Sequence, residues 1–262
     1  MAVCLSAFTQ SSPKLLLEPS AHLNDFQVIE FRRYTIKPGA RQQFAKYFDN
    51  FFPEAMEQTG AIAAGTFFER TNSNGFTWIR GFHTIEARAV NNAQFYYGPV
   101  WKEHKNAMNE LMTDSDNVLL LRPLAAEHGL MILPAVDPVK EPAGAQGVVV
   151  ALIFAVKANS VDAFAKLTEA DFNAYEKAGA REAGELVTLD ATNNFPQLPV
   201  RTDGPFFVWL GILRDNAMLE KQFMPVVERS LEALSTSDLV RSKPELVVLD
   251  PTPRSRMRWL PE

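Results

Sequence analysis

The sequence predicts an α+β protein built from two copies of one unit, each with the element order β-α-β-β-α-β. Short sequence matches recur in the same order, at offsets between 119 and 131 along the chain, and internal self-similarity of this kind marks a duplicated architecture. Each copy also shows the same succession of strand and helix patterns. Hydrophobic residues make up 47% and charged residues 22% of the chain, which is the composition of a globular protein and excludes a wholly disordered one.

Five pairs of segments define the repeat, because the members of each pair share residue types and internal spacing. The pairs are 44–46 with 164–166, 57–65 with 176–184, 76–79 with 207–210, 99–100 with 225–226, and 118–123 with 246–251. Their offsets drift slowly, through 120, 119, 131, 126 and 128. Five matches in one order are not expected by chance, so the chain is an internal duplication.

The first copy begins with a strand rich in β-branched and aromatic residues. Its expected strands are 28–37, 61–70, 76–83 and 118–124. Turn signals separate them: Pro38-Gly39 ends the first strand, and Asn74-Gly75 marks a hairpin. Apolar residues at helical spacing predict a helix from Phe44 to Ala55, and a second helical stretch runs to about residue 112 with an interruption at Gly98-Pro99.

The second copy repeats this order. Its expected strands lie near 148–157, 181–190, 206–213 and 245–250, and its helices near 160–178 and 216–238. This order is the ferredoxin-like split βαβ arrangement. The hairpin connection at 191–205 is longer than its counterpart in the first copy, since the offset rises from 119 before it to 131 after it. It is expected to be a surface insertion, with a lid or an arm toward another subunit as the alternative.

The expected domain organisation follows from the repeat. The segments are a leader at 1–26, a first ferredoxin-like domain at 27–125, a linker at 126–146, a second ferredoxin-like domain at 147–251 and a tail at 252–262. A ferredoxin-like unit usually buries its open sheet face against a second copy, so we expect an intrachain pseudo-dimer, with a further homodimer as an additional partner. The tail carries Arg254, Arg256 and Arg258 and is expected to cross the chain's own acidic surface or that of a neighbouring subunit.

Charge and cysteine content limit the classes of partner. The net charge is -5, which is against nucleic-acid binding because phosphate contacts need a basic surface. No apolar run reaches the length of a membrane span, and the leader lacks the charged start of a signal peptide. The single cysteine, Cys4, excludes an intrachain disulfide, so a cytoplasmic protein is expected.

A set of polar residues distinguishes the first copy from the second. Glu30, Arg32 and Tyr34 alternate along the first strand and therefore share one face of the sheet, and Arg80 has the same orientation on its strand. The counterparts of the first three at offset 120 are Val150, Leu152 and Phe154. One interpretation is a structural ion pair. The other is a pocket between sheet and helices in which an arginine faces an anionic ligand.

Aromatic residues surround the helix interruption at Gly98-Pro99. Tyr97 and Trp101 either pack the broken helix onto the sheet or form one wall of a ligand cavity. His104 follows on the same helix and is expected to be partly buried. The four histidines are not paired at metal-ligand spacing, so neither a metal nor a cofactor is expected.

The first copy resembles the NIPSNAP family. The resemblance rests on residues 30–39, Glu-Phe-Arg-Arg-Tyr-Thr-Ile-Lys-Pro-Gly, and on residues 95–103, Phe-Tyr-Tyr-Gly-Pro-Val-Trp-Lys-Glu. It covers about residues 26–125 and implies a dimeric α+β-barrel, here formed within one chain. It implies no particular reaction, because related barrels include enzymes and plain binding modules.

Three function classes follow from these observations, and the sequence does not decide whether the protein is an enzyme. The first is a NIPSNAP-like protein that binds a small anionic or aromatic molecule or acts without catalysis. The second is a cofactor-independent monooxygenase or isomerase acting on an apolar anionic metabolite. The third is a haem-binding or haem-degrading protein. The candidate ligand-binding residues are Arg32, Tyr34, Arg80, Tyr97, Trp101 and His104.

Overall fold

The computed structural model describes residues 25–260, so expectations about the leader fall almost wholly outside it. Each repeat supplies four strands. They are β1 (Val28–Ile36), β2 (Ile62–Glu69), β3 (Gly75–Phe82), β4 (Met112–Pro123), β5 (Val148–Ala155), β6 (Arg181–Thr188), β7 (Phe206–Leu213) and β8 (Glu245–Pro251). The first repeat carries helices α1 (Arg41–Phe51), α2 (Pro53–Glu57), α3 (Ile85–Tyr96) and α4 (Pro99–Asn109). A short 3-10 turn η1 (Ala126–His128), α5 (Val161–Lys177), α6 (Asn216–Met218), the π-turn η2 (Leu219–Phe223) and α7 (Met224–Ser235) complete the chain.

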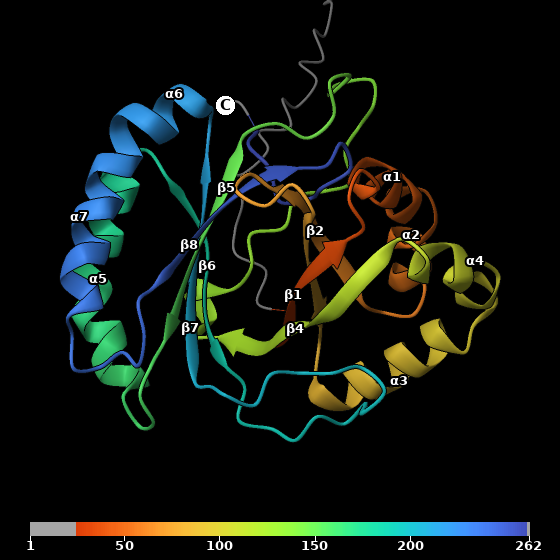
Figure 1. The fold of residues 1–262 in the computed structure, drawn as a ribbon, viewed down its shortest axis with the longest axis horizontal. Helices are drawn as coiled ribbons and strands as arrows, with labels where there is room; N and C mark the ends of the chain where they lie inside the picture. Colours follow the sequence, from red (N-terminus) through yellow and green to blue (C-terminus); the bar gives the residue numbers. More distant parts are fainter. Residues whose placement is uncertain (1–24, 261–262) are drawn as a thin grey trace, which may run out of the picture.

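The eight strands close into one antiparallel barrel with the order β1-β3-β2-β8-β5-β7-β6-β4. The two repeats join at two places, β2 with β8, where Phe67 lies opposite Pro251, and β4 with β6, where Leu121 lies opposite Thr188. The helices of the first repeat cover one side of the barrel, and those of the second repeat cover the opposite side (Figure 1). The expected pair of ferredoxin-like units, closed within one chain, is confirmed.

Strand pairing confirms that the sequence offsets describe equivalent positions. Arg32 pairs with Trp78 in the first repeat, and Leu152 pairs with Trp209 in the second. The pair Glu30–Arg80 corresponds in the same way to Val150–Gly211. The helices after these strands also start at equivalent positions. The side chains of Thr84 and Asp215, which correspond at offset 131, each cap the next helix. The two repeats can therefore be compared residue by residue.

Three apolar cores hold the molecule together. One fills the barrel interior, and the other two lie between each half of the barrel wall and its helices. The interior core includes Leu130, Met131 and Ile132 from the segment that connects the repeats, together with Phe26 and Met257 from outside the two domains. Residues 130–132 of the connecting segment are therefore part of the interior core.

Two elements differ from the expected ones. Strand β4 begins at Met112, earlier than the expected start at Val118, because its polar first half pairs with the end of β1 across two register shifts. The first helix is divided at Phe52, since Pro53 has no amide hydrogen to continue the helical bonding and instead starts α2.

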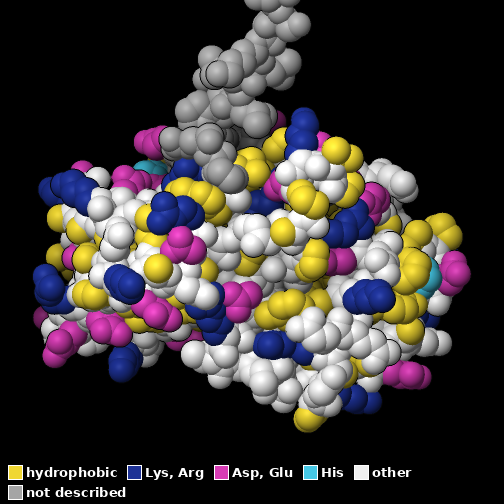
Figure 2. Space-filling model, turned by 90° about the horizontal axis from the view of Figure 1, so that it is seen from above, with side chains coloured by type: hydrophobic (Ala, Val, Ile, Leu, Met, Phe, Trp, Pro, Cys, Tyr) yellow, Lys and Arg dark blue, Asp and Glu magenta, His cyan; other side chains and the backbone are white. Residues whose placement is uncertain are grey.

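The C-terminal segment lies on the chain's own acidic side chains, one of the two places expected for it. Arg254 pairs with Glu54, the Nη2 of Arg256 lies 2.7 Å from Glu57, and Nε of Arg258 lies 2.6 Å from Glu141. Basic and acidic side chains are intermixed over the face of the molecule drawn in Figure 2. Within residues 25–260, every helix is too short or too polar to cross a bilayer.

Candidate functional site

A cavity of about 120 Å³ lies between the outer face of the first repeat's sheet and helices α1 to α4. Most of its lining is aromatic or methionine side chains, which gives it an apolar wall. The polar lining residues are fewer. The lining consists of Arg32, Tyr34, Phe44, Phe48, Phe52, Met56, Trp78, Phe95, Tyr96, Trp101, Met108, Asn109, Met112, Ser115, Gln197, Leu198 and Pro199.

A buried cluster of charges adjoins this cavity. The carboxylate of Glu30 accepts from three guanidinium groups: Nη1 of Arg32 at 2.6 Å, Nε of Arg80 at 2.7 Å and Nε of Arg88 at 2.6 Å. All four side chains are at most 1% exposed. Arg32 also donates from Nε to the hydroxyl of Tyr34 at 2.8 Å, and its side chain lines the cavity.

The cluster carries excess positive charge. Three guanidinium charges against the one carboxylate that contacts them within residues 25–260 leave a net charge of +2. Burial alone would raise the pKa of Glu30, but the charges of Arg80, Arg32 and Arg88 outweigh burial and hold that pKa well below its usual range. Burial lowers the pKa of Arg88, against the opposing effect of Glu30.

Several donors in this region have no acceptor. The Nη2 atoms of Arg80 and Arg88 and the indole Nε1 of Trp78 are buried without a hydrogen-bond partner among the described residues. An unpaired buried donor costs about 1–3 kcal/mol, and more when it is charged. The positive charge and the vacant donors both favour an anion at this place.

The long hairpin connection of the second repeat forms one wall of the cavity. Asn193 and Asn194 accept from Nη1 of Arg88 at 3.0 and 2.9 Å. Phe195 stacks on Tyr96 with ring centroids 6.0 Å apart, and three further loop residues, 197–199, line the cavity. The loop thus reaches across from the second repeat to α3 of the first (Figure 1) and forms part of the cavity wall.

The structure brings together some of the six candidate residues and not others. Arg32, Tyr34 and Trp101 line the cavity, and Arg80 lies behind the wall in the charged cluster, 5.0 Å from the centre of the Trp78 ring. Tyr97 is 54% exposed and donates to Gln197 of the loop at 2.7 Å.

His104 lies outside the cavity. It bonds to the hydroxyl of Tyr47 at 2.7 Å and stacks on Phe51. His83 stacks on Phe26 with ring centroids 4.8 Å apart. Neither histidine lines the cavity.

Sequence reasoning missed Arg88. It lies on a helix, where the alternation that revealed Arg32 does not apply, yet its counterpart at offset 131 is Leu219, a buried apolar residue. A comparison of the two copies along the helices as well as the strands would have found it. The contacts of residues 197–199 had no local signal, because they depend on where the loop folds.

Comparisons with known proteins agree with this architecture. The NIPSNAP family model matches residues 29–126, and no curated protein matches the chain. A structure described as a candidate monooxygenase, from Lactobacillus acidophilus NCFM, is similar with a TM-score of 0.55 and 13% identity, covering 86% of this chain and 94% of its own. An anthrone oxidase-like protein is similar with a TM-score of 0.54 and 12% identity, over 87% of this chain and 92% of its own.

A NIPSNAP family protein of unknown function from Agrobacterium tumefaciens aligns over a shorter range. It covers 39% of this chain and 93% of its own, with 21% identity and a TM-score of 0.35. The full-length likenesses show the fold. Residues 29–126, which form the first repeat, match the NIPSNAP domain model.

Proposed function

We propose that the first repeat binds a small organic anion with an apolar, aromatic body. The observation that carries this proposal is the buried net charge of +2 beside an aromatic cavity, with guanidinium donors of Arg80 and Arg88 that have no partner among the described residues. Arg32 would bind the anionic group, because it is the one arginine among the residues that line the cavity. A guanidinium is well suited to a carboxylate, whose two oxygens match its parallel N–H groups.

The cavity limits the ligand to a small molecule or to the buried part of a larger one. A cavity of about 150 Å³ holds a benzene molecule, and this one measures about 120 Å³, so an aromatic ring would enter it only with an outward shift of the lining loop residues 197–199. The loop that lines it is held by hydrogen bonds from Arg88 and Tyr97. The ends of the loop are also bonded to β4, through the amides of Leu189 and Arg201, so ligand entry past the loop would break the side-chain hydrogen bonds of its middle part.

Binding of benzoate tests the proposal directly, with its neutral analogue benzamide as a comparison. Trp78 and Trp101 line the cavity, so their fluorescence reports occupation. We expect saturable binding of benzoate, weaker binding of benzamide, and at least a tenfold loss of benzoate affinity in Arg32→Gln. Arg122→Gln is the matched control, because Arg122 is exposed and lies outside the cavity.

Equal affinities for benzoate and benzamide would contradict the anion site, and so would equal losses in the two arginine variants. Denaturing mass spectrometry of the purified protein provides an independent measurement. A retained small organic acid would support the proposal and identify the natural ligand class.

A catalytic role at the same cavity is a second proposal. Two full-length structural neighbours are named for oxygenase or oxidase chemistry, and Tyr34, whose hydroxyl accepts from Arg32, lines the cavity. Burial raises the pKa of Tyr34, so this phenol would stay protonated and donate a hydrogen bond to a bound anion rather than act as a base. Oxygen consumption in the presence of a bound aromatic acid, lost in Tyr34→Phe, would support this role. The haem alternative gains no support, because neither His83 nor His104 lines the cavity.

A further inference from the structure

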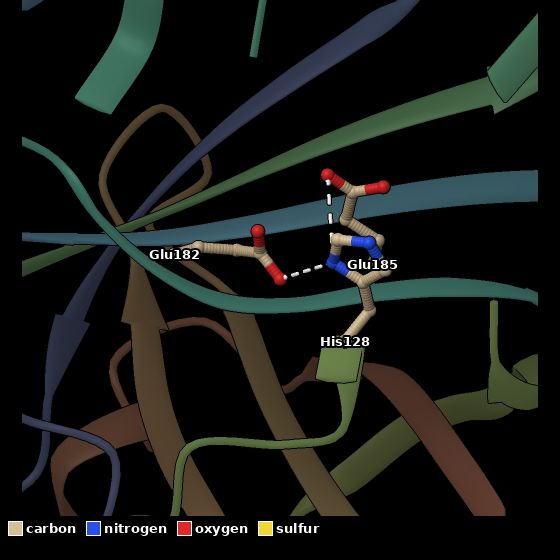
Figure 3. Close-up of side chains that lie close together, drawn as sticks. All are labelled: His128, Glu182 and Glu185. Carbon is tan, nitrogen blue, oxygen red and sulfur yellow. Dashed lines mark hydrogen bonds and ion pairs between the residues drawn. The ribbon is translucent and has the colours of Figure 1, made fainter. Parts of the chain in front are cut away.

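A second group of polar side chains lies on the other repeat, away from the cavity. Nδ1 of His128 lies 2.9 Å from Oε1 of Glu182 and 3.9 Å from Oε1 of Glu185. All three ligand atoms lie within 4.8 Å of one another. Figure 3 shows both carboxylates pointing from β6 toward the imidazole, which comes from the connecting segment.

A β-bulge explains why two glutamates at positions i and i+3 share one face of a strand. In regular β structure, residues i and i+3 point to opposite faces. Here Glu182 lies opposite Gly211 and Glu185 opposite Trp209, so three steps along β6 match only two along β7. The extra residue reverses the alternation and brings both carboxylates to the outer face, and bulges often orient side chains for a site in this way.

The equivalent place in the first repeat has a different charge balance. Glu182 and Glu185 correspond at offset 119 to Ala63 and Thr66, and His128 corresponds at offset 128 to Arg256. Backbone pairing supports the equivalence, because the amides after β4 and β8 bond to Glu185 and Thr66 respectively, each at 2.8 Å. In the first repeat, Arg256 is paired with a carboxylate, Glu57, at 2.7 Å.

The second repeat has more carboxylates here and fewer cations. The charged groups that act most strongly on the Glu185 carboxyl are His128 and three carboxylates, those of Glu182, Glu176 and Glu169. Glu185 is 7% exposed, and its carboxylate makes no hydrogen bond within residues 25–260, where the nearest cationic group is His128. A buried carboxylate without a hydrogen bond or a full positive charge is costly.

We propose that His128, Glu182 and Glu185 bind a divalent transition-metal ion of the Zn²⁺ type. Imidazole nitrogen and carboxylate oxygen are zinc ligands with bonds of about 2.0–2.2 Å, which places tetrahedral ligand atoms about 3.3 Å apart. The observed separations of 2.9 and 3.9 Å from Nδ1 lie on either side of this value. The two carboxylate oxygens lie within 4.8 Å of each other, so side-chain rotations would bring three ligand atoms around the ion, with the fourth position left for water. The ion supplies the positive charge that arginine supplies in the first repeat, and it fastens the connecting segment to β6.

Sequence spacing gave no indication of this site. His128 stands between the two repeats, and both glutamates lie far beyond it on the second repeat's hairpin, so the three residues form no recognisable ligand motif. This explains why no metal was expected from the sequence.

Calorimetric titration of the full chain with ZnCl₂, after treatment with a chelator and its removal, tests the proposal. We expect one Zn²⁺ per chain at this site. His128→Gln and Glu185→Gln should each weaken binding at least tenfold. The double variant Glu182→Ala/Glu185→Thr, which introduces the residues of the first repeat, should abolish it. His104→Gln is the matched control and should bind like the unaltered protein, because His104 lies on α4, outside the cluster.

The melting temperature of each metal-free variant separates loss of a ligand from loss of the fold, and the comparison uses variants that melt as the unaltered protein does. The proposal is overturned if the unaltered protein does not bind Zn²⁺ at a concentration of about 10⁻⁴ M, a level that corresponds to weak binding. It is also overturned if His128→Gln and the double variant bind Zn²⁺ as tightly as His104→Gln does.

Discussion

The two helix-covered faces of the barrel occupy equivalent places and contain different chemistry. In the first repeat, the face holds Glu30, Arg32, Arg80 and Arg88 beside a cavity. The equivalent residues of the second repeat are Val150, Leu152, Gly211 and Leu219, and three of them belong to a closed apolar core. A Cβ atom at Gly211 would lie 2.2 Å from the Trp209 ring, so the indole covers the place where Arg80 stands in the other copy.

The second repeat shows that this fold needs no charged side chain at these four positions. A buried ion cluster is a weak source of stability, since well-packed apolar residues often replace one without loss. The charges of the first repeat are therefore better explained by a ligand than by the fold. Four comparisons test how far this contrast extends.

The largest effect is expected for Glu30→Gln. This change removes the carboxylate from three buried guanidinium groups, and breaking a buried ion pair costs about 3–5 kcal/mol. Glu69→Gln is the matched control, because Glu69 is also buried but pairs with the partly exposed Arg33 and should lose less. Urea denaturation measures both. Similar losses of unfolding free energy in the two variants would mean that the three guanidinium groups depend on the Glu30 charge no more than Arg33 depends on that of Glu69.

Trp209→Ala and Trp78→Ala compare the two cores at equivalent positions. Trp209 is fully buried in a closed core, and its loss should cost about 3–5 kcal/mol. Trp78 already borders a cavity, so fewer contacts are lost and the cost should be smaller by about 1 kcal/mol or more. Thermal unfolding of both proteins decides the order. A reversed order would show that Trp78 is the better packed of the two.

Exchange of the charged residues for those of the second repeat should preserve the fold and remove the ligand site. The variant Glu30→Val/Arg32→Leu/Arg80→Gly/Arg88→Leu is expected to unfold with a free energy equal to that of the natural chain or up to about 4 kcal/mol higher. Benzoate should no longer bind. A destabilised variant would show instead that the cluster contributes to folding.

Asp49 provides a pH-dependent difference between the repeats, because its counterpart at offset 120 is the exposed Glu169. Burial raises the pKa of Asp49 to about 6 from its usual 3.8, although the hydrogen bond from Thr252 and the charge of Arg254 oppose the shift. The folded state then holds this proton more tightly than the unfolded state. The associated stability is complete below pH 3.8 and is lost as the pH rises through about 6.

Asp49→Asn should therefore raise the free energy of unfolding at pH 8, by at most about 3 kcal/mol, and change it little at pH 4. Denaturation at the two pH values measures this difference. Glu169→Gln, the matched change in the second repeat, should have little effect at either pH. An equal change at both pH values in Asp49→Asn would contradict a raised pKa for this group.

Much of the fold was predictable from the sequence, because strand alternation and the repeat are local or regular signals. The same signals identified Arg32 and Tyr34 as members of a polar set, since period two places them on one face. They did not show which arginines would meet at Glu30. The loop at 191–205 was recognised as an insertion from the change in offset. Its contacts with Arg88 join residues 105 and 106 positions apart, and no sequence pattern within either repeat predicts contacts between such distant residues.

Covalent closure of the barrel changes how substitutions act on it. In a barrel made from two identical chains, every mutation occurs twice, so a residue that suits a binding face must also be tolerated on the opposite one. In this chain, each substitution occurs once. One copy can therefore become a purely structural partner while the other keeps its polar residues, and a loop from the structural copy can grow to serve the binding one. The covalent link between the two copies thus allows one to specialise in binding and the other in structural support.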